Sequence, residues 1–159
     1  MLTSILNMNG LLDVFGKTHP AVAHFPVALL VTALLAELLA WKLKKTSLHT
    51  TAVFCLFIGT IGALVATLSG FPFTQITFFN ARPPLLVKHQ IAGYAVVLLG
   101  VSACSMKLFP RTKYPGSKTT YYLYLFLLAL VAGLTIYTSH TGGLLVYGED
   151  FFTSSPGNP

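Results

Sequence analysis

The sequence predicts an all-α fold, an integral membrane bundle of four transmembrane helices that forms one domain over residues 1–159. Three observations lead to this prediction. Hydrophobic residues make up 54% of the chain, charged residues only 9%, and the mean hydropathy is +0.72. Soluble domains carry about 25% charged residues. The apolar residues also gather in four runs of about 20 residues, the length that crosses a bilayer core of about 30 Å.

The four runs are expected to be helices, because a chain in lipid must satisfy its backbone hydrogen bonds internally. None of them alternates strictly between apolar and polar residues, as a transmembrane β-barrel would. A segment at 1–18 precedes them and lacks the basic start of a signal peptide, so we expect a short helix at the outer membrane surface. Residues 152–159 have the composition of a flexible tail. The expected spans are 20–42, 51–70, 86–108 and 120–140.

The positive residues fix the expected orientation. Seven of the ten lie near the loop after the first span or the loop before the fourth. The positive-inside rule places these two loops in the cytoplasm and both termini outside. Since the charges lie between spans and not along one face, nucleic acid is not an expected partner, whereas the lipid bilayer is. The seven are Lys42, Lys44, Lys45, Lys107, Arg111, Lys113 and Lys118.

Four of the five histidines fall at one predicted depth. His19 and His24 open the first span, His89 opens the third, and His140 closes the fourth, so all four lie near the outer membrane boundary. Ionisable residues at membrane depth are costly and commonly mark a functional site, and neutral imidazole is a common metal ligand. The alternative is that histidine is merely tolerated at the interface. His49 is expected in a polar cytoplasmic loop.

A donor set made only of imidazoles suits haem iron, copper or zinc. Haem b is favoured, bound without covalent attachment because the chain has no CxxCH motif. Small residues near the histidines, such as Gly93, Gly142 and Gly143, would admit a flat macrocycle, and four-helix bundles commonly hold cofactors. Basic residues near the histidines could pair with the haem propionates. These residues are Arg82, Lys88 and Lys17.

The expected axial ligands are His24 and His89, with His140 and His19 as a second pair or as supporting hydrogen-bond donors. Five residues of helix turn the chain by about 500°. His19 and His24 therefore point in different directions and are not expected to bind one iron together. One or two haems are compatible with four histidines.

The predicted function is electron transfer by a membrane b-type cytochrome in the bacterial inner membrane. Because the histidines share one depth, electrons would pass near the outer face, to or from a quinone or a periplasmic c-type cytochrome. The alternatives are a copper- or zinc-binding or transport protein and a non-catalytic membrane anchor. No nucleophile constellation points to a stand-alone enzyme. A homo-oligomer or a subunit of a larger redox complex is possible.

Glu37 is the one acidic residue inside a predicted span. We expect it to reach the inner interface and to pair with Lys42, Lys44 or another base of the loop. The alternative is a carboxylate of a proton relay or of a quinone site. Three small residues of the second span have the spacing that lets helices pack closely. They are Gly62, Ala66 and Gly70.

Three blocks of the sequence together resemble a bacterial family of predicted four-helix membrane proteins of unknown function, sometimes joined to c-type cytochrome domains. The blocks are HPAVAHFPVALLVTALLAELL (19–39), HQIAGY (89–94) and SHTGGLLVYG (139–148). The family's histidines are matched by His19, His24, His89 and His140, and the resemblance implies a membrane redox or haem-binding role. Family members commonly carry an arginine after the histidine of the third span, where this chain has Gln90.

Overall fold

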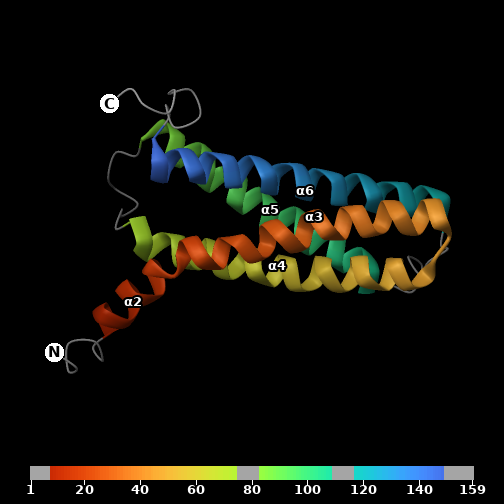
Figure 1. Ribbon diagram of the computed structural model, residues 1–159, viewed down its shortest axis with the longest axis horizontal. Helices are drawn as coiled ribbons and strands as arrows, with labels where there is room; N and C mark the ends of the chain where they lie inside the picture. Colours follow the sequence, from red (N-terminus) through yellow and green to blue (C-terminus); the bar gives the residue numbers. More distant parts are fainter. Residues whose placement is uncertain (1–7, 75–82, 109–116, 149–159) are drawn as a thin grey trace, which may run out of the picture.

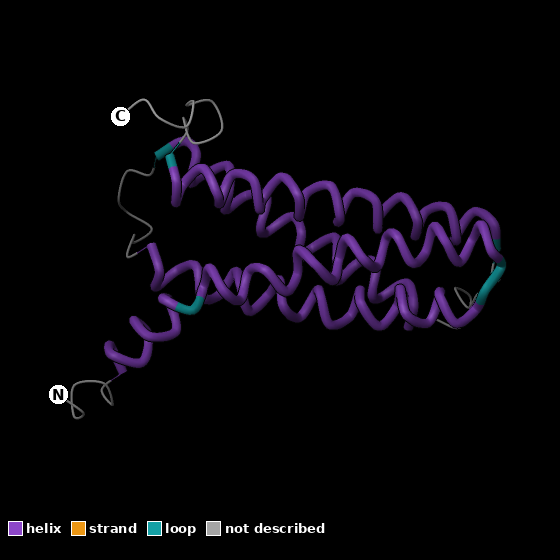
Figure 2. Tube along the Cα trace, viewed as in Figure 1, coloured by secondary structure: helices purple, strands orange, loops and turns teal. Residues whose placement is uncertain are grey.

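The computed structural model describes residues 8–74, 83–108 and 117–148. Over these residues the fold is all-α and contains no strand, as Figure 2 shows. A short helix precedes four long ones. The helices are α2 (Met8–Lys17), α3 (His19–Leu43), α4 (Thr46–Thr74), α5 (Pro84–Leu108) and α6 (Lys118–Tyr147).

The four long helices confirm the four predicted spans. Each has 25 to 30 residues and is long and apolar enough to cross a membrane. All four are longer than the apolar runs predicted, because the backbone hydrogen bonds continue beyond the ends of each run. Between α3 and α4, Lys44 adopts the left-handed conformation (φ 53°) and ends α3. The Lys45 N–H then bonds back to the Ala40 carbonyl, which makes a tight turn.

The long helices form a bundle of two hairpins, α3–α4 and α5–α6 (Figure 1). α3 packs against α4 and α6, and α5 packs against the same two helices. α3 and α5 therefore lie across the bundle from each other and run in the same direction. We call the end that carries α2 and the start of α3 the α2 end. The opposite end, which carries the α3–α4 turn, is the turn end.

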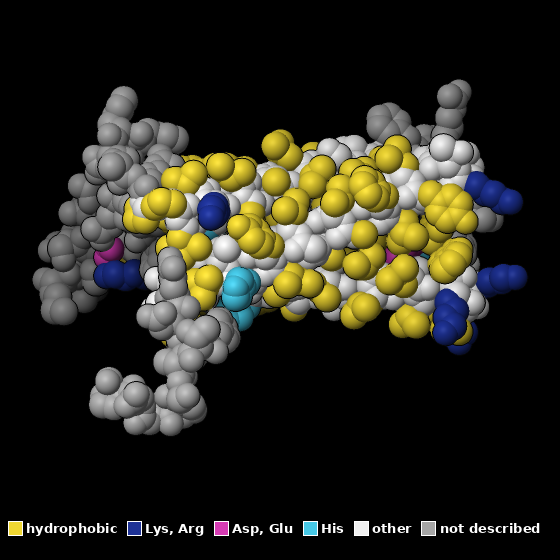
Figure 3. All heavy atoms as spheres, turned by 90° about the horizontal axis from the view of Figure 1, so that it is seen from above, with side chains coloured by type: hydrophobic (Ala, Val, Ile, Leu, Met, Phe, Trp, Pro, Cys, Tyr) yellow, Lys and Arg dark blue, Asp and Glu magenta, His cyan; other side chains and the backbone are white. Residues whose placement is uncertain are grey.

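The bundle has a small core and an apolar outer surface. Leu30, Leu56 and Leu128 have no exposed surface and belong to one core cluster shared by the helices. Large hydrophobic side chains such as Leu98 (69% exposed) and Phe25 (66% exposed) point outward. In Figure 3, hydrophobic side chains cover the middle of the bundle, and Lys side chains lie toward both ends, several of them at the turn end. This is the surface of a multi-pass membrane protein, whose outward face contacts lipid.

The short helix α2 packs mainly on α4 and is amphipathic. It exposes Leu11, Leu12 and Val14. Its Lys17 Nζ lies 2.7 Å from Asp13 Oδ2, one helical turn away. An amphipathic helix at the end of the bundle fits the predicted position at a membrane surface, which stays a prediction.

Candidate functional site

His19 begins α3 and is bound to the neighbouring helix of its own hairpin. Its Nδ1 lies 2.9 Å from the Ala66 carbonyl oxygen and 3.2 Å from Ser69 Oγ, both in α4. A carbonyl oxygen can only accept a hydrogen bond, so Nδ1 carries the proton and donates it. The lone pair of the neutral ring is then on Nε2. This is the tautomer in which a histidine binds a metal through Nε2.

His89, near the start of α5, has the same arrangement in the second hairpin. Its Nδ1 lies 3.0 Å from the Thr138 carbonyl oxygen and 3.3 Å from Thr141 Oγ1, both in α6. The same argument places the proton on Nδ1 and the lone pair on Nε2. Both rings are half-buried. Each hairpin therefore holds one oriented histidine at the α2 end.

A glycine lies against each of the two rings. A Cβ on Gly70 would come 3.3 Å from His19 Cε1, and a Cβ on Gly142 would come 3.1 Å from His89 Cε1. In both hairpins, the residue with the accepting carbonyl is followed three positions later by a hydroxyl residue and then directly by the glycine. The two sets are Ala66, Ser69 and Gly70 in α4, and Thr138, Thr141 and Gly142 in α6. The two hairpins thus repeat one local structure.

The two histidines face each other across the bundle. The ring centroids of His19 and His89 are 6.4 Å apart, and the ring planes meet at 87°. Metal–imidazole bonds are about 2 Å long, so two imidazoles on opposite sides of one metal have centroids roughly 6 Å apart. The observed separation of 6.4 Å is close to this distance.

The other predicted ligands lie elsewhere. His24 is exposed, and its Nδ1 lies 2.6 Å from the Pro20 carbonyl of its own helix. His140 is exposed on α6. The structure therefore brings His89 together with His19, and not with His24 as expected. The turn of the helix accounts for this, because only one of the two residues at the start of α3 can face the bundle interior.

Of the three basic residues expected near a cofactor, two lie among the described residues. Lys88 is exposed and precedes His89 directly. Lys17 is engaged by Asp13, as described above. Arg82 lies outside the described residues. Lys88 is therefore an exposed base that adjoins one of the paired histidines in the chain.

Among the described residues, His19 and His89 are the two donors that the site brings together. Within the described ranges no group of three or more His, Cys, Asp or Glu side chains could hold a metal ion. Protein zinc sites use three or four such ligands.

Sequence reasoning missed the residues that hold the two rings. Gly70 was expected to serve helix packing, but it makes room for the His19 ring. Of the glycines expected to admit a macrocycle, Gly142 lies at the His89 ring, whereas Gly143 has nothing within 4 Å of an added Cβ. The repeated order of hydroxyl residue and glycine, Ser69–Gly70 and Thr141–Gly142, was a signal that could have found both sets.

A second polar cluster, at the turn end, was also missed. The expected position of His49 in a polar loop is wrong, because it lies in the first turn of α4 and is only 8% exposed. Its Nδ1 lies 2.8 Å from Glu37 Oε2 and 3.0 Å from Oε1. Glu37 therefore pairs with His49, and not with Lys42 or Lys44. Both lysines are exposed.

Comparison with known proteins gives one match. No curated protein and no solved structure matches the chain significantly. The profile of a family described as "Predicted membrane protein (DUF2231)" matches residues 17–154, which include the four spans and both paired histidines. The match covers most of the chain and agrees with the resemblance seen in the three sequence blocks. The chain therefore belongs to this family of predicted membrane proteins.

Proposed function

We propose that the protein is a membrane b-type cytochrome that binds one haem b between His19 and His89 and acts in electron transfer. The opposed pair of imidazoles carries this proposal. Both rings are half-buried, both are held in the tautomer that presents Nε2, and their centroids are 6.4 Å apart.

The donor set supports haem over a bare metal ion. Haem supplies four equatorial nitrogen ligands itself and needs only axial ligands from the protein. Zinc in proteins is usually held by three or four side chains. Two imidazoles, with no third donor grouped beside them among the described residues, suit the haem.

The residues around the rings would position the ligands. A hydrogen bond from the second ring nitrogen to a carbonyl fixes the orientation of an imidazole and makes it a stronger ligand. Ala66 and Thr138 accept that bond through their carbonyls. Gly70 and Gly142 let each ring lie directly against the neighbouring helix. A bound haem would supply reversible one-electron transfer.

The place of the site suggests where electrons pass. Lys42, Lys44 and Lys45 are exposed at the turn end, which the positive-inside rule assigns to the cytoplasm. The paired histidines are at the α2 end, so the haem would lie near the outer face. A quinone in the membrane or a periplasmic carrier such as a c-type cytochrome would be the electron partner. Lys88 is available to a haem propionate.

The experiment is the absorption spectrum of the purified protein, oxidised and reduced, with a haem and metal analysis. We expect a sharp Soret band, α and β bands on reduction, and one haem per chain. A colourless protein that contains copper or zinc would refute the haem and favour the alternative metal. Two haems per chain would refute the single site.

Electron paramagnetic resonance tests the geometry of the ligand pair. Axial ligands set the electronic properties of haem iron. Two axial imidazoles with perpendicular planes leave two iron d orbitals close in energy. We therefore expect a strongly anisotropic low-spin ferric signal from rings that meet at 87°. The less anisotropic signal of parallel imidazole planes would exclude the His19–His89 pair in this arrangement.

A further inference from the structure

The turn end of the bundle holds a buried polar cluster to which all four long helices contribute. Glu37 of α3 is fully buried, His49 of α4 is 8% exposed, and Tyr124 of α6 is 1% exposed. Lys107 of α5 lies with its Nζ 3.5 Å from the centroid of the Tyr124 ring. Ionisable side chains at membrane depth are costly, and they mark proton or ligand sites by default.

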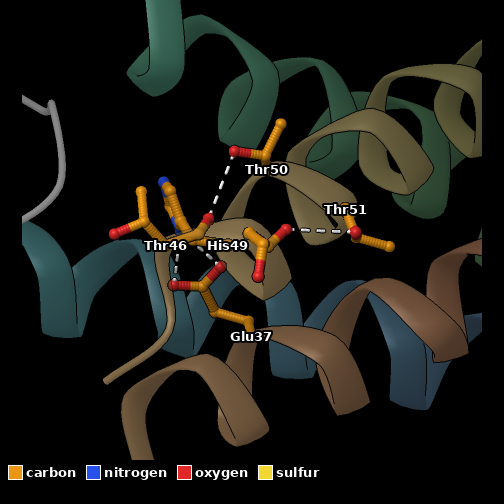
Figure 4. Close-up of polar contacts among 6 residues, drawn as sticks. Glu37, Thr46, His49, Thr50 and Thr51 are labelled. Atoms are coloured by element: carbon orange, nitrogen blue, oxygen red, sulfur yellow. Dashed lines mark hydrogen bonds and ion pairs between the residues drawn. The ribbon is translucent and has the colours of Figure 1, made fainter. Parts of the chain in front are cut away.

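The contact between Glu37 and His49 defines where protons are held. Figure 4 shows the carboxylate of Glu37 pointing from α3 toward the His49 ring on α4. His49 Nδ1 lies within hydrogen-bond distance of both carboxylate oxygens, at 2.8 Å and 3.0 Å. This is the geometry of an N–H group that donates to an ionised carboxylate, in which both oxygens can accept a hydrogen bond. The neutral His49 ring then has its lone pair on Nε2.

The charges around the pair balance when His49 is neutral. Lys107 and Glu37 interact electrostatically, and so do Tyr124 and Glu37. One lysine cation and one carboxylate sum to zero, and neutral histidine and tyrosine add nothing. The titratable groups that interact with Glu37 are Lys107 of α5 and Tyr124 of α6. Tyr121 of α6 and Cys104 of α5 interact in turn with Tyr124.

One further group in the cluster has an unfilled hydrogen-bonding requirement. The Tyr124 hydroxyl is buried and has no hydrogen-bond partner among the described residues. A buried hydroxyl of this kind is commonly satisfied by an ordered water.

The cluster has a short route to bulk water at the turn end. His49 lies in the first turn of α4, directly after exposed residues of the α3–α4 turn. The side chain of His49 is 11% exposed, whereas that of Glu37 is not exposed at all. His49 is therefore the member of the pair that water can reach.

We propose that Glu37 and His49 form a proton-binding site that opens to the aqueous phase at the turn end. One proton from water binds to Nε2 of His49 and leaves its conjugate base in the water. The Nδ1–H bond to Glu37 stays, and the product is an imidazolium–carboxylate pair. No electron is transferred, and the net charge of the cluster rises by one. Because the site lies at the other end of the bundle, it does not depend on the proposed haem.

A purely structural role is the competing explanation. Replacing a buried ion pair by apolar side chains of similar size is commonly neutral or stabilising. If the pair only stabilised the fold, apolar residues at both positions would therefore serve equally well. A structural pair that excludes water would hold the same charge while the protein is folded, whereas a proton-binding site changes its charge, so the two explanations give different outcomes.

The test uses nuclear magnetic resonance of the full-length protein with ¹⁵N-labelled histidine, in lipid. His24→Asn and His140→Asn remove the two exposed histidines from the spectrum, and His49→Asn in that background assigns the His49 signals. The pH is lowered from about 8 to about 5, the range in which histidine changes its charge. We expect Nε2 of His49 to change from the lone-pair form to the protonated form while Nδ1 stays protonated.

Glu37→Gln provides the second measurement, because it keeps an acceptor oxygen for Nδ1 and removes the charge. We expect fewer protonated His49 side chains in this variant than in its parent at the lowest pH. The proposal is overturned if Nε2 of His49 does not change over the pH range. It is also overturned if His49 protonates to the same extent in Glu37→Gln as in the parent. A third overturning result is an infrared spectrum of the parent that places the proton on the Glu37 carboxyl. Circular dichroism confirms that the variants keep their helices.

Discussion

The two ends of the bundle differ in how the hairpins use matching positions. At the α2 end the hairpins match: His19 and His89 are both held by a carbonyl and a hydroxyl, and both lie against a glycine. At the turn end they do not match. Glu37 follows His19 by eighteen residues and Lys107 follows His89 by eighteen, so an acid in one hairpin stands where the other has a base.

This difference assigns different chemistry to the two ends. Matched ligands from two hairpins suit one centre that lies between them and is bound equally by both. Opposite charges at matching positions, with His49 beside the acid, suit a site whose charge can change by one proton. The four predictions that follow test this comparison, from the largest expected effect to the smallest.

Removing a ligand at the α2 end should have the largest effect. His19→Ala and His89→Ala should each abolish haem binding, because one axial imidazole is lost. His24→Ala and His140→Ala are the matched controls and should keep one haem per chain. Haem content is measured in the purified proteins. If His24→Ala loses the haem and His19→Ala keeps it, the first expected pair of ligands was right.

Breaking the pair at the turn end should lower stability and leave the haem unchanged. Glu37→Ala leaves a buried histidine without its partner, which costs about 3–5 kcal/mol for a buried pair. The free energy of unfolding is measured in detergent by denaturant titration. The haem spectrum is recorded in the same sample. A change in that spectrum would show that the two ends are not independent.

Adding a methyl group beside a ligand should weaken haem binding by an intermediate amount. Gly142→Ala places a Cβ 3.1 Å from His89 Cε1, whereas at Gly143 the added Cβ has nothing within 4 Å. Overpacking of this kind costs about 1–3 kcal/mol. The gain in helix propensity is common to both variants, so Gly143→Ala is the control. Equal haem affinities in the two variants would contradict the close approach of the ring.

Removing one supporting hydroxyl should have the smallest effect. Ser69→Ala and Thr141→Ala each remove one partner of a ligand histidine, while the carbonyl stays. A hydrogen bond of this kind contributes about 0.5–1.5 kcal/mol. Haem affinity should fall by a similar factor in the two variants, because the hairpins match. A large effect in one variant alone would show that the two ligands are not equivalent.

Most of the fold could be predicted from hydropathy. Lipid forces an apolar run of about 20 residues to become a helix, so the four spans follow from composition and length. The ends of the helices could not be predicted in this way. Thr46 and Lys118 are polar, and the helices nevertheless begin there because their backbones continue the hydrogen-bond ladder.

The neighbouring pair of histidines was only half predictable. The depth of the histidines followed from the topology, and His89 was among the expected ligands. The choice between His19 and His24 depends on how the helices are rotated against each other. Close contacts set that rotation, such as Gly59 against Leu30, where a Cβ would come 2.8 Å from Leu30 Cδ2. His49 was placed wrongly because a polar stretch was taken for a loop, although α4 begins before it.

Each imidazole is bonded to the partner helix within its own hairpin, α3 to α4 and α5 to α6. Each hairpin therefore carries one half of the candidate site, with its histidine oriented by contacts within that hairpin. A rigid movement of one hairpin away from the other would separate the rings and leave every one of these bonds intact. On the proposed function, a cofactor held between the two rings would be released when the hairpins part, without the unfolding of a helix.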